Sequence, residues 1–142
     1  EKNPRPHCSN PLLRSTGGHI HISYKFPSAA KAVWLARAMD LFHSVPGVIM
    51  DDDIKRRQLY GKAGAFRYKP YGMEYRTPSN FWLETPDLRM WTYETALRAC
   101  AFLETDPDAQ DLLKKYEQDI VSCINTSDKK LAAKILKETA NG

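Results

Sequence analysis

The sequence predicts an α+β fold, with a small antiparallel sheet in the first half of the chain and helices packed against it. Two observations support this prediction. Polar and apolar residues alternate over short segments before residue 78, which is typical of strands. Across residues 85–142 apolar residues recur at helical spacing instead, so we expect a helical closing region. The 142 residues are 42% hydrophobic and 27% charged, which indicates one globular unit over 1–142.

The first predicted strand covers about residues 17–24 and follows residues 1–14, a proline-containing stretch that we expect to be an extended lead-in. The strand segment reads GGHIHISY and alternates with period two. His19 and His21 therefore face one side of the sheet, and the isoleucines that follow each of them face the other.

Two helices are expected next. The first covers about residues 29–44, with Ser28 as its N-cap and the Pro46-Gly47 pair as its end. The second is short, about residues 52–59. The acidic run at 51–53 favours the start of this helix, because negative charge stabilises a helix N-terminus. A metal-binding cluster is the alternative interpretation of that run.

A hairpin follows, with strands over about 65–69 and 73–77 and a turn between them. Alternation in its second strand places Glu74 and Arg76 on one face. The closing region then contains helices over about 86–104, 108–124 and 128–139.

Composition excludes several classes of protein. The three cysteines are odd in number and form no CxxC pair, which argues against a disulfide scaffold and a cysteine-rich zinc site. No apolar run approaches the roughly 18 residues of a membrane span, and the first residues lack the apolar core of a secretory signal. We therefore expect a cytoplasmic protein that makes no membrane contact.

Positive charge is concentrated in the first half of the chain. Residues 1–76 carry 13 Lys and Arg against 6 Asp and Glu, whereas residues 77–142 carry 8 against 11. This distribution suggests that the first half binds an anion such as a phosphate or a nucleotide. An unevenly charged solvated surface is the alternative.

Two pairs of residues spaced two apart are candidate site residues. His19 and His21 project side by side from a strand, so they are suited to a metal or a phosphate-bearing ligand, unless they are simply exposed. Glu74 and Arg76 either pair with each other or bind a divalent metal and an anionic oxygen, respectively.

Basic and aromatic residues interleave between residues 55 and 71. Arginine suits phosphate geometry and aromatic rings stack on bases, so this stretch is suited to a nucleotide or to single-stranded nucleic acid, unless it simply covers a sheet edge. The chain has no GK[ST] phosphate loop and no GxGxxG motif, so any nucleotide would be held by side chains and metal.

Three motifs, taken in order, resemble a known family. Residues 13–22 read LRSTGGHIHI, residues 56–67 read RRQLYGKAGAFR, and residues 71–82 read YGMEYRTPSNFW. They are similar to segments of the phage-type carboxylate–amine ligases (amidoligase type 2), within the glutamine synthetase and glutamate–cysteine ligase superfamily. The resemblance covers about residues 10–84.

The resemblance implies a fold and a reaction. The fold would be half of a glutamine synthetase-like antiparallel sheet, whose concave face holds ATP and Mg²⁺ or Mn²⁺. The reaction would be ATP-dependent amide formation, in which a carboxylate becomes an acyl phosphate that an amine then attacks. The substrates would be a carboxylate and an amine, such as an amino acid or a peptide.

The resemblance also implies roles for individual residues. His19 and Glu74 would bind the metal, and Arg76 would contact the substrate and the transferred phosphate. His21, Arg57, Lys62 and Arg67 would bind the nucleotide, with Arg67 also acting in catalysis. Gly72 stands where glutamine synthetase has an arginine, so one nucleotide contact is absent or moved.

The resemblance further implies that this chain is the C-terminal half of a catalytic domain, because the acidic strands that complete the metal shell have no counterpart. We therefore expect a longer protein or a second chain to supply that half, in the cytoplasm of a bacterial host if the protein is phage-encoded. A homo-oligomer is consistent with the superfamily. A non-catalytic phage structural or host-interaction module is the alternative function, and a nucleic-acid partner is less consistent with the motifs.

Overall fold

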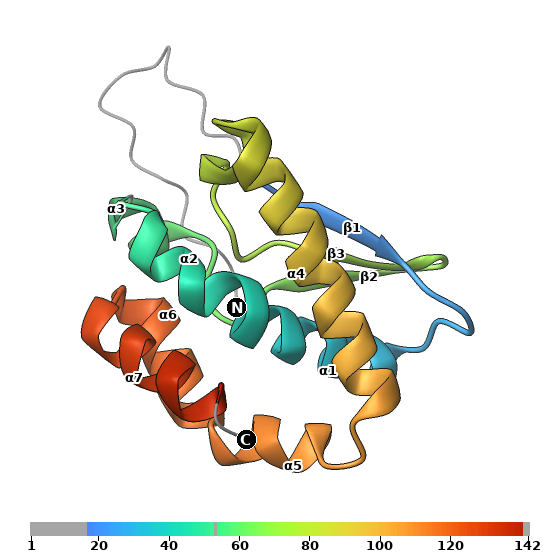
Figure 1. Cartoon of the computed structure of the whole chain (residues 1–142). Helices are drawn as coiled ribbons and strands as arrows, with labels where there is room; N and C mark the ends of the chain where they lie inside the picture. Colours follow the sequence, from blue (N-terminus) through green and yellow to red (C-terminus); the bar gives the residue numbers. More distant parts are fainter. Residues whose placement is uncertain (1–16, 53, 141–142) are drawn as a thin grey trace.

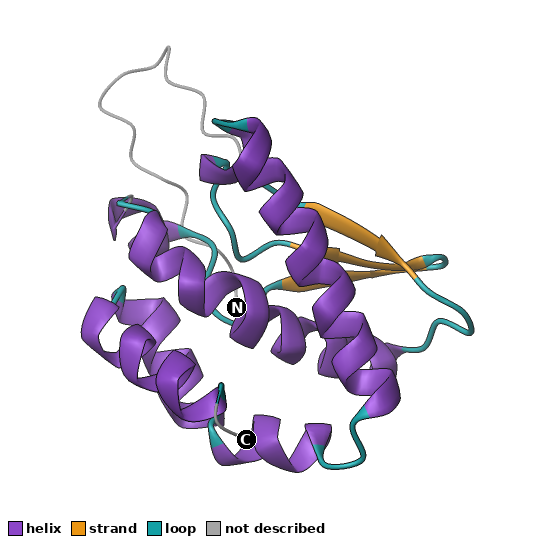
Figure 2. Ribbon diagram, viewed as in Figure 1, coloured by secondary structure: helices purple, strands orange, loops and turns teal. Residues whose placement is uncertain are grey.

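The computed structural model describes residues 17–52 and 54–140, so the expected lead-in at 1–14 lies outside the described residues. The fold is α+β, as the sequence predicts, and Figures 1 and 2 show the helices gathered on one side of a three-stranded sheet. Within the described ranges, no helix is both long enough and apolar enough to span a bilayer.

The sheet is antiparallel and consists of β1 (Ile20–Ser23), β2 (Phe66–Lys69) and β3 (Gly72–Tyr75). The strand order is β1-β3-β2, so β3 is central. Glu74 lies opposite His21 on β1 and opposite Arg67 on β2, which makes one polar row across the sheet. Because side chains alternate along a strand, the predicted separation of polar and apolar faces is confirmed.

The apolar face of the sheet packs against the first long helix. Met73 and Tyr75 on β3 are fully buried, and α1 (Ala29–Met39) crosses behind β2 and β3. Ser28 is the N-cap of α1, as predicted, and its hydroxyl accepts a hydrogen bond from the Lys31 N–H at 3.2 Å.

The prediction that this helix ends at Pro46-Gly47 is wrong. The chain continues through a π-helical turn, η1 (Asp40–Ser44), and then through α2 (Val45–Met50). Proline disrupts an α-helix because it lacks an N–H and its ring crowds the preceding turn. Here the wider π turn ends at Ser44 and changes the hydrogen-bonding pattern just before Pro46, the second residue of α2, so the ring is accommodated without ending the helix.

The remaining helices are α3 (Ile54–Leu59), the 3₁₀ turn η2 (Phe81–Leu83), α4 (Pro86–Thr105), α5 (Ala109–Lys115), α6 (Glu117–Thr126) and α7 (Lys129–Thr139). The single helix predicted over 108–124 is therefore wrong, because Tyr116 separates α5 from α6. The physical reason is packing: α5 lies against α1 and α4, whereas α6 lies against α2, α3 and α7.

One hydrophobic cluster joins the sheet to the helices. Its centre is η1 and α2, which contact the buried face of α6 and α7 on one side and α4 on the other. The buried thiol of Cys123 belongs to this cluster, and neither Cys123 nor Cys100 forms a disulfide. The helical layer therefore fixes β3 from behind and leaves the polar row on the opposite face.

Candidate functional site

A buried carboxylate surrounded by cationic side chains occupies the centre of the polar row. Glu74 is only 4% exposed. Its Oε1 lies 3.1 Å from His19 Nδ1 and accepts a hydrogen bond from Arg76. Its Oε2 lies 3.4 Å from Arg67 Nη1 and 3.2 Å from Lys69 Nζ. With Tyr60, described below, these side chains form what we call the Glu74 cluster: His19, Tyr60, Arg67, Lys69, Glu74 and Arg76.

The glycine before His19 allows a close approach that fixes this end of β1. The Gly18 N–H donates to Pro78 O at 3.3 Å, and the Trp82 indole N–H donates to Gly18 O at 3.1 Å. A Cβ atom at position 18 would lie 1.9 Å from Ser79 O, so no other residue fits without movement of the backbone. The segment after β3 thus holds His19 beside Glu74.

Tyr60 belongs to the site, although the sequence analysis did not select it. Its hydroxyl accepts a hydrogen bond from Arg76 and lies 3.3 Å from His19 Nε2. Its ring stacks on the imidazole of His19 with centroids 6.1 Å apart. The only sequence signal was its place in the basic and aromatic stretch.

Arg56 supports Tyr60 from the other side. Its guanidinium lies 5.3 Å from the centroid of the Tyr60 ring and donates hydrogen bonds to Thr77 O at 3.0 Å and Pro78 O at 2.7 Å. Gly61 makes this possible, because its φ of +73° is unfavourable for other residues and a Cβ there would lie 2.2 Å from Arg56 Nη1. Arg56 therefore links α3 to the end of β3.

The electrostatics of the cluster keep Glu74 ionised and His19 neutral. Burial raises the pKa of Glu74, but the hydrogen bond from Lys69 and the charge of Arg76 outweigh it, so the pKa is lowered overall. Burial, together with the charge of Arg76, lowers the pKa of His19, and Glu74 offsets this only in part. A neutral imidazole and a carboxylate are the protonation states that a metal ligand needs.

The cluster carries more positive than negative charge. Arg67, Lys69 and Arg76 surround a single carboxylate, and the side chain of Arg67 is 58% exposed. Surplus guanidinium and ammonium groups at an accessible surface suit a multiply charged anion, and arginine suits phosphate best because it can donate two parallel hydrogen bonds.

The donor set fits part of a divalent metal shell. His19 and Glu74 bring one nitrogen and one carboxylate oxygen within 3.1 Å of each other. Among residues 17–52 and 54–140, no group of three or more histidine, cysteine or acidic side chains is placed to hold an ion. Mg²⁺ bound together with a nucleotide commonly uses only one or two protein ligands, with phosphates and waters completing the shell. The two residues fit that role and do not make a closed metal site.

The structure does not bring every predicted site residue into the cluster. His21 lies on the same face, where its Nδ1 is 2.5 Å from the Tyr71 hydroxyl. Lys62 is exposed in the turn between α3 and β2. Arg57, by contrast, is 3% exposed and its Nη2 lies 3.7 Å from Asp51 Oδ2, on the helical side of the fold. The adjacent Arg56 occupies the position near the site.

The acidic run at 51–53 is used for ion pairs. Asp51 is buried beside Arg57, and Asp52 pairs with Lys129 at 2.7 Å. Asp53 lies outside the described residues. Neither Asp51 nor Asp52 reaches the Glu74 cluster.

A family model described as "Phage phiEco32-like COOH.NH2 ligase-type 2" matches residues 9–134, which is most of the chain. No curated protein and no solved structure matches the sequence.

Proposed function

The chain belongs to the phage phiEco32-like COOH.NH2 ligase-type 2 family, and we propose that the Glu74 cluster binds the phosphates of ATP during the joining of a carboxylate to an amine. The family name itself indicates a carboxylate–amine ligase. The ATP-dependent route is our proposal, because a carboxylate must be activated before an amine can displace one of its oxygens.

The proposed reaction has two steps. A carboxylate oxygen of the first substrate attacks the γ-phosphorus of ATP, the bond from that phosphorus to the β–γ bridging oxygen breaks, and ADP leaves. The nitrogen of the amine then attacks the acyl carbon, phosphate leaves with the bonding electrons, and the nitrogen loses a proton to give the amide. Both steps transfer or release phosphate, so they need positive charge close to phosphate oxygens.

The observation that carries the proposal is the surplus of cations around Glu74. Arg76 and Arg67 would stabilise the negative charge of the transferred phosphoryl group, since a guanidinium is worth most where charge develops in the transition state. Tyr60 orients Arg76 through its hydroxyl. His21, on the same face, would contact the remaining phosphates, and Lys62 would do so from the exposed turn between α3 and β2. Arg57 is left out of this assignment because it is buried against Asp51.

His19 and Glu74 would contribute two ligands to Mg²⁺ or Mn²⁺. When bound, the ion would neutralise phosphate charge. The ligands beyond these two would come from phosphate oxygens, from water, and from acidic residues on another segment of the protein or on a second chain.

The test is ATP binding by calorimetry, followed by phosphate release in the presence of candidate carboxylates and amines. We expect Arg76→Gln to weaken Mg-ATP binding about tenfold or more, because a charge-assisted contact to phosphate is lost. Arg98→Gln is the charge-matched control, since Arg98 lies on α4 against the ring of Phe42 and away from the cluster. Equal affinity of wild type and Arg76→Gln would contradict the proposal and favour a non-catalytic module.

A further inference from the structure

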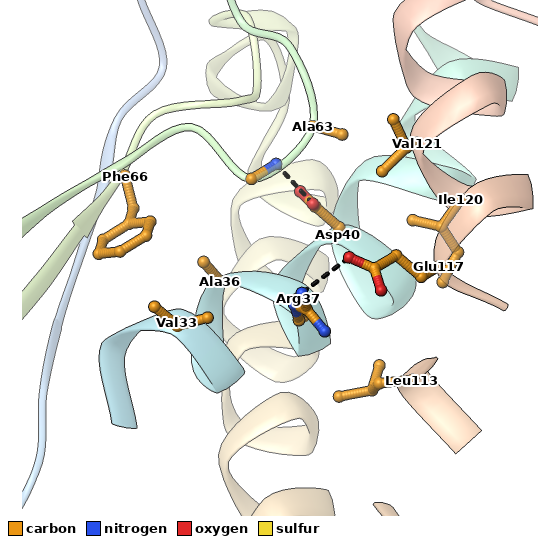
Figure 3. Close-up of a pocket in the computed structure, with 11 residues that line it drawn as sticks. Val33, Ala36, Arg37, Asp40, Ala63, Phe66, Leu113, Glu117, Ile120 and Val121 are labelled. Carbon is orange, nitrogen blue, oxygen red and sulfur yellow. Dashed lines mark hydrogen bonds and ion pairs between the residues drawn. The ribbon is translucent and has the colours of Figure 1, made fainter. Parts of the chain in front are cut away.

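A buried carboxyl group lies directly behind the Glu74 cluster, on the helical side of β3. Asp40 is the first residue of η1 and is 3% exposed. It accepts a hydrogen bond from the Tyr75 hydroxyl at 2.5 Å and another from the Gly64 N–H at 2.6 Å. Figure 3 shows the carboxyl group of Asp40 directed at the loop that carries Gly64.

The hydrogen bond from the Tyr75 hydroxyl to Asp40 holds the end of β3 that lies next to the Glu74 cluster. Tyr75 stands between Glu74 and Arg76 in sequence, and its side chain points to the opposite face. Ser44, the last residue of η1, lies 2.6 Å from the same hydroxyl. Since the tyrosine has one hydrogen and gives it to Asp40, Ser44 donates to the tyrosine. The Asp40 carboxyl and the Ser44 hydroxyl, both from η1, thus fix the position of β3 against the helices and its rotation about its own axis.

The hydrogen bond from the Gly64 N–H to Asp40 holds Arg76 through a second set of contacts. Gly64 belongs to the loop between α3 and β2, and the next residue, Ala65, accepts a hydrogen bond from the Arg76 N–H at 2.7 Å. Thr77 also donates to Lys62 O of this loop at 3.0 Å. Asp40 therefore holds both β3, which Arg76 directly follows, and the loop to which the Arg76 backbone is bound.

Burying a carboxyl group at this position costs free energy. Burial raises the pKa of Asp40 to about 7, although the hydrogen bonds from Tyr75 and Gly64 oppose the shift. The other charged groups around it are Arg37 on α1, which lowers the pKa, and Glu117 on α6, which pairs with Arg37 at 2.7 Å. Filling space alone would be served better by an apolar residue.

A small cavity adjoins the carboxyl group. It has a volume of about 250 Å³, and Figure 3 shows the Arg37–Glu117 pair beside it among apolar side chains that include Val33, Phe66 and Ile120. A space of this size is large enough for water, which would give the carboxyl group a route for exchanging its proton with solvent.

We propose that Asp40 is a positioning residue for the Glu74 cluster, which it aligns through Tyr75 and Gly64 so that Glu74 and Arg76 meet a triphosphate in the correct geometry. The inference rests on the proposed function for its ligand. The part of the inference that concerns structure, namely that Asp40 aligns Arg76, does not depend on any ligand.

The first experiment measures binding of inorganic tripolyphosphate, in the presence of Mg²⁺, to wild type, Asp40→Asn and Tyr75→Phe. We expect both variants to bind about fivefold to tenfold more weakly, because each loses a hydrogen bond that aligns β3. Ile135→Val is the control, since Ile135 is fully buried on α7 and its truncation destabilises the fold away from β3. Wild-type affinity in both variants would overturn the proposal.

A pH series separates positioning from general destabilisation. An ionised carboxylate accepts from Tyr75 and Gly64 more strongly than a neutral acid does. The ratio of wild-type to Asp40→Asn affinity should therefore rise between pH 6 and pH 8, and the ionisation of tripolyphosphate itself cancels in this ratio. A ratio that stays constant with pH would count against the proposal.

Amide hydrogen exchange at Arg76 provides the ligand-free measurement. Asp40→Asn and Tyr75→Phe should accelerate this exchange. Ile135→Val should not accelerate it when the variants are compared under conditions that correct for their different losses of Tm. Failure of wild type to bind tripolyphosphate would refute the proposed function alone, because the exchange result still decides whether Asp40 aligns Arg76. If Asp40→Asn does not fold, Tyr75→Phe alone decides the tripolyphosphate-binding and the hydrogen-exchange measurements.

Discussion

His19 and Glu74 are 55 positions apart in the sequence, and yet the imidazole Nδ1 of one lies 3.1 Å from the carboxylate Oε1 of the other. Two features produce this approach. Antiparallel pairing of β1 with β3 brings the segments together, and the close contact of Gly18 with the chain after β3 sets the position of His19. The pair places a neutral imidazole beside an ionised carboxylate within the cationic Glu74 cluster.

Replacing Glu74 with glutamine should raise the affinity for metal-free ATP and reduce the gain in affinity that Mg²⁺ provides. Glu74→Gln removes the single negative charge among three cations, so metal-free ATP should bind severalfold more tightly, and the added benefit of Mg²⁺ should fall. Calorimetry in EDTA and in Mg²⁺ measures both. A variant whose Mg²⁺ dependence equals that of wild type would show that Glu74 is not a metal ligand.

Replacing Tyr60 with phenylalanine should affect ligand binding more than stability. Tyr60→Phe keeps the ring that stacks on His19 and Arg56 but removes the hydroxyl that orients Arg76. We expect about a threefold to tenfold loss of Mg-ATP affinity, and a change in the free energy of unfolding of about 1 kcal/mol or less. Tyr68→Phe is the matched control, because Tyr68 is exposed and lies outside the cluster. Equal losses in the two variants would argue against this role.

The buried carboxyl of Asp40 should make wild type lose stability as the pH rises from about 4 to about 7. In that window the unfolded chain has already released the Asp40 proton, whereas the folded chain retains it because its pKa is about 7. Above pH 7 the loss is complete. Asp40→Asn cannot titrate, so the difference in unfolding free energy between wild type and variant should shift by up to a few kcal/mol.

Urea unfolding of both proteins at several pH values checks this. The subtraction matters because burial lowers the pKa of His43 to about 3, which gives the opposite slope: the unfolded state takes up a proton below about pH 6.5 and the folded state does not. That contribution is common to wild type and Asp40→Asn. A difference that does not vary with pH would show that Asp40 has an ordinary pKa.

Alanine at two glycine positions should have different outcomes. Gly18→Ala places a methyl group against Ser79 O and should destabilise the fold by roughly 1–3 kcal/mol. Gly47→Ala lies within α2, where its Cβ would meet only the Phe81 ring at 3.6 Å, and should stabilise by about 0.5–1 kcal/mol through helix propensity. Thermal unfolding distinguishes the two, and a neutral Gly18→Ala would show that this contact does not constrain the chain.

Strand alternation was enough to predict which side chains share a face within each strand. Period two alone places His19 with His21 and Glu74 with Arg76, whereas only the family resemblance implied that the two pairs meet. Lys69 follows once the hairpin register is known. Tyr60 does not follow, because its direction depends on how α3 packs against the end of β3. Arg56 and Arg57 are adjacent and chemically identical, so only tertiary packing decides that Arg56 approaches the site and Arg57 is buried.

The helix boundaries that the sequence missed have the same kind of cause. Pro46 predicts the end of a helix, and a local rule contains nothing about a π turn that accommodates the ring. Tyr116 has no proline, glycine or capping residue beside it to mark a break between α5 and α6. The break results from contacts with different partners, which are remote in sequence.

The exposure of Arg67 beside a nearly covered Glu74 has a kinetic consequence. At low ionic strength the attraction of an exposed charge extends over a long Debye length, about 30 Å at 0.01 M salt, whereas at physiological ionic strength it is screened beyond about 8 Å. An incoming triphosphate would meet the exposed guanidinium of Arg67 first and only then displace Arg76 from its carboxylate. Association should therefore slow steeply as salt is added, whereas dissociation should depend on the inner ion pairs and change far less.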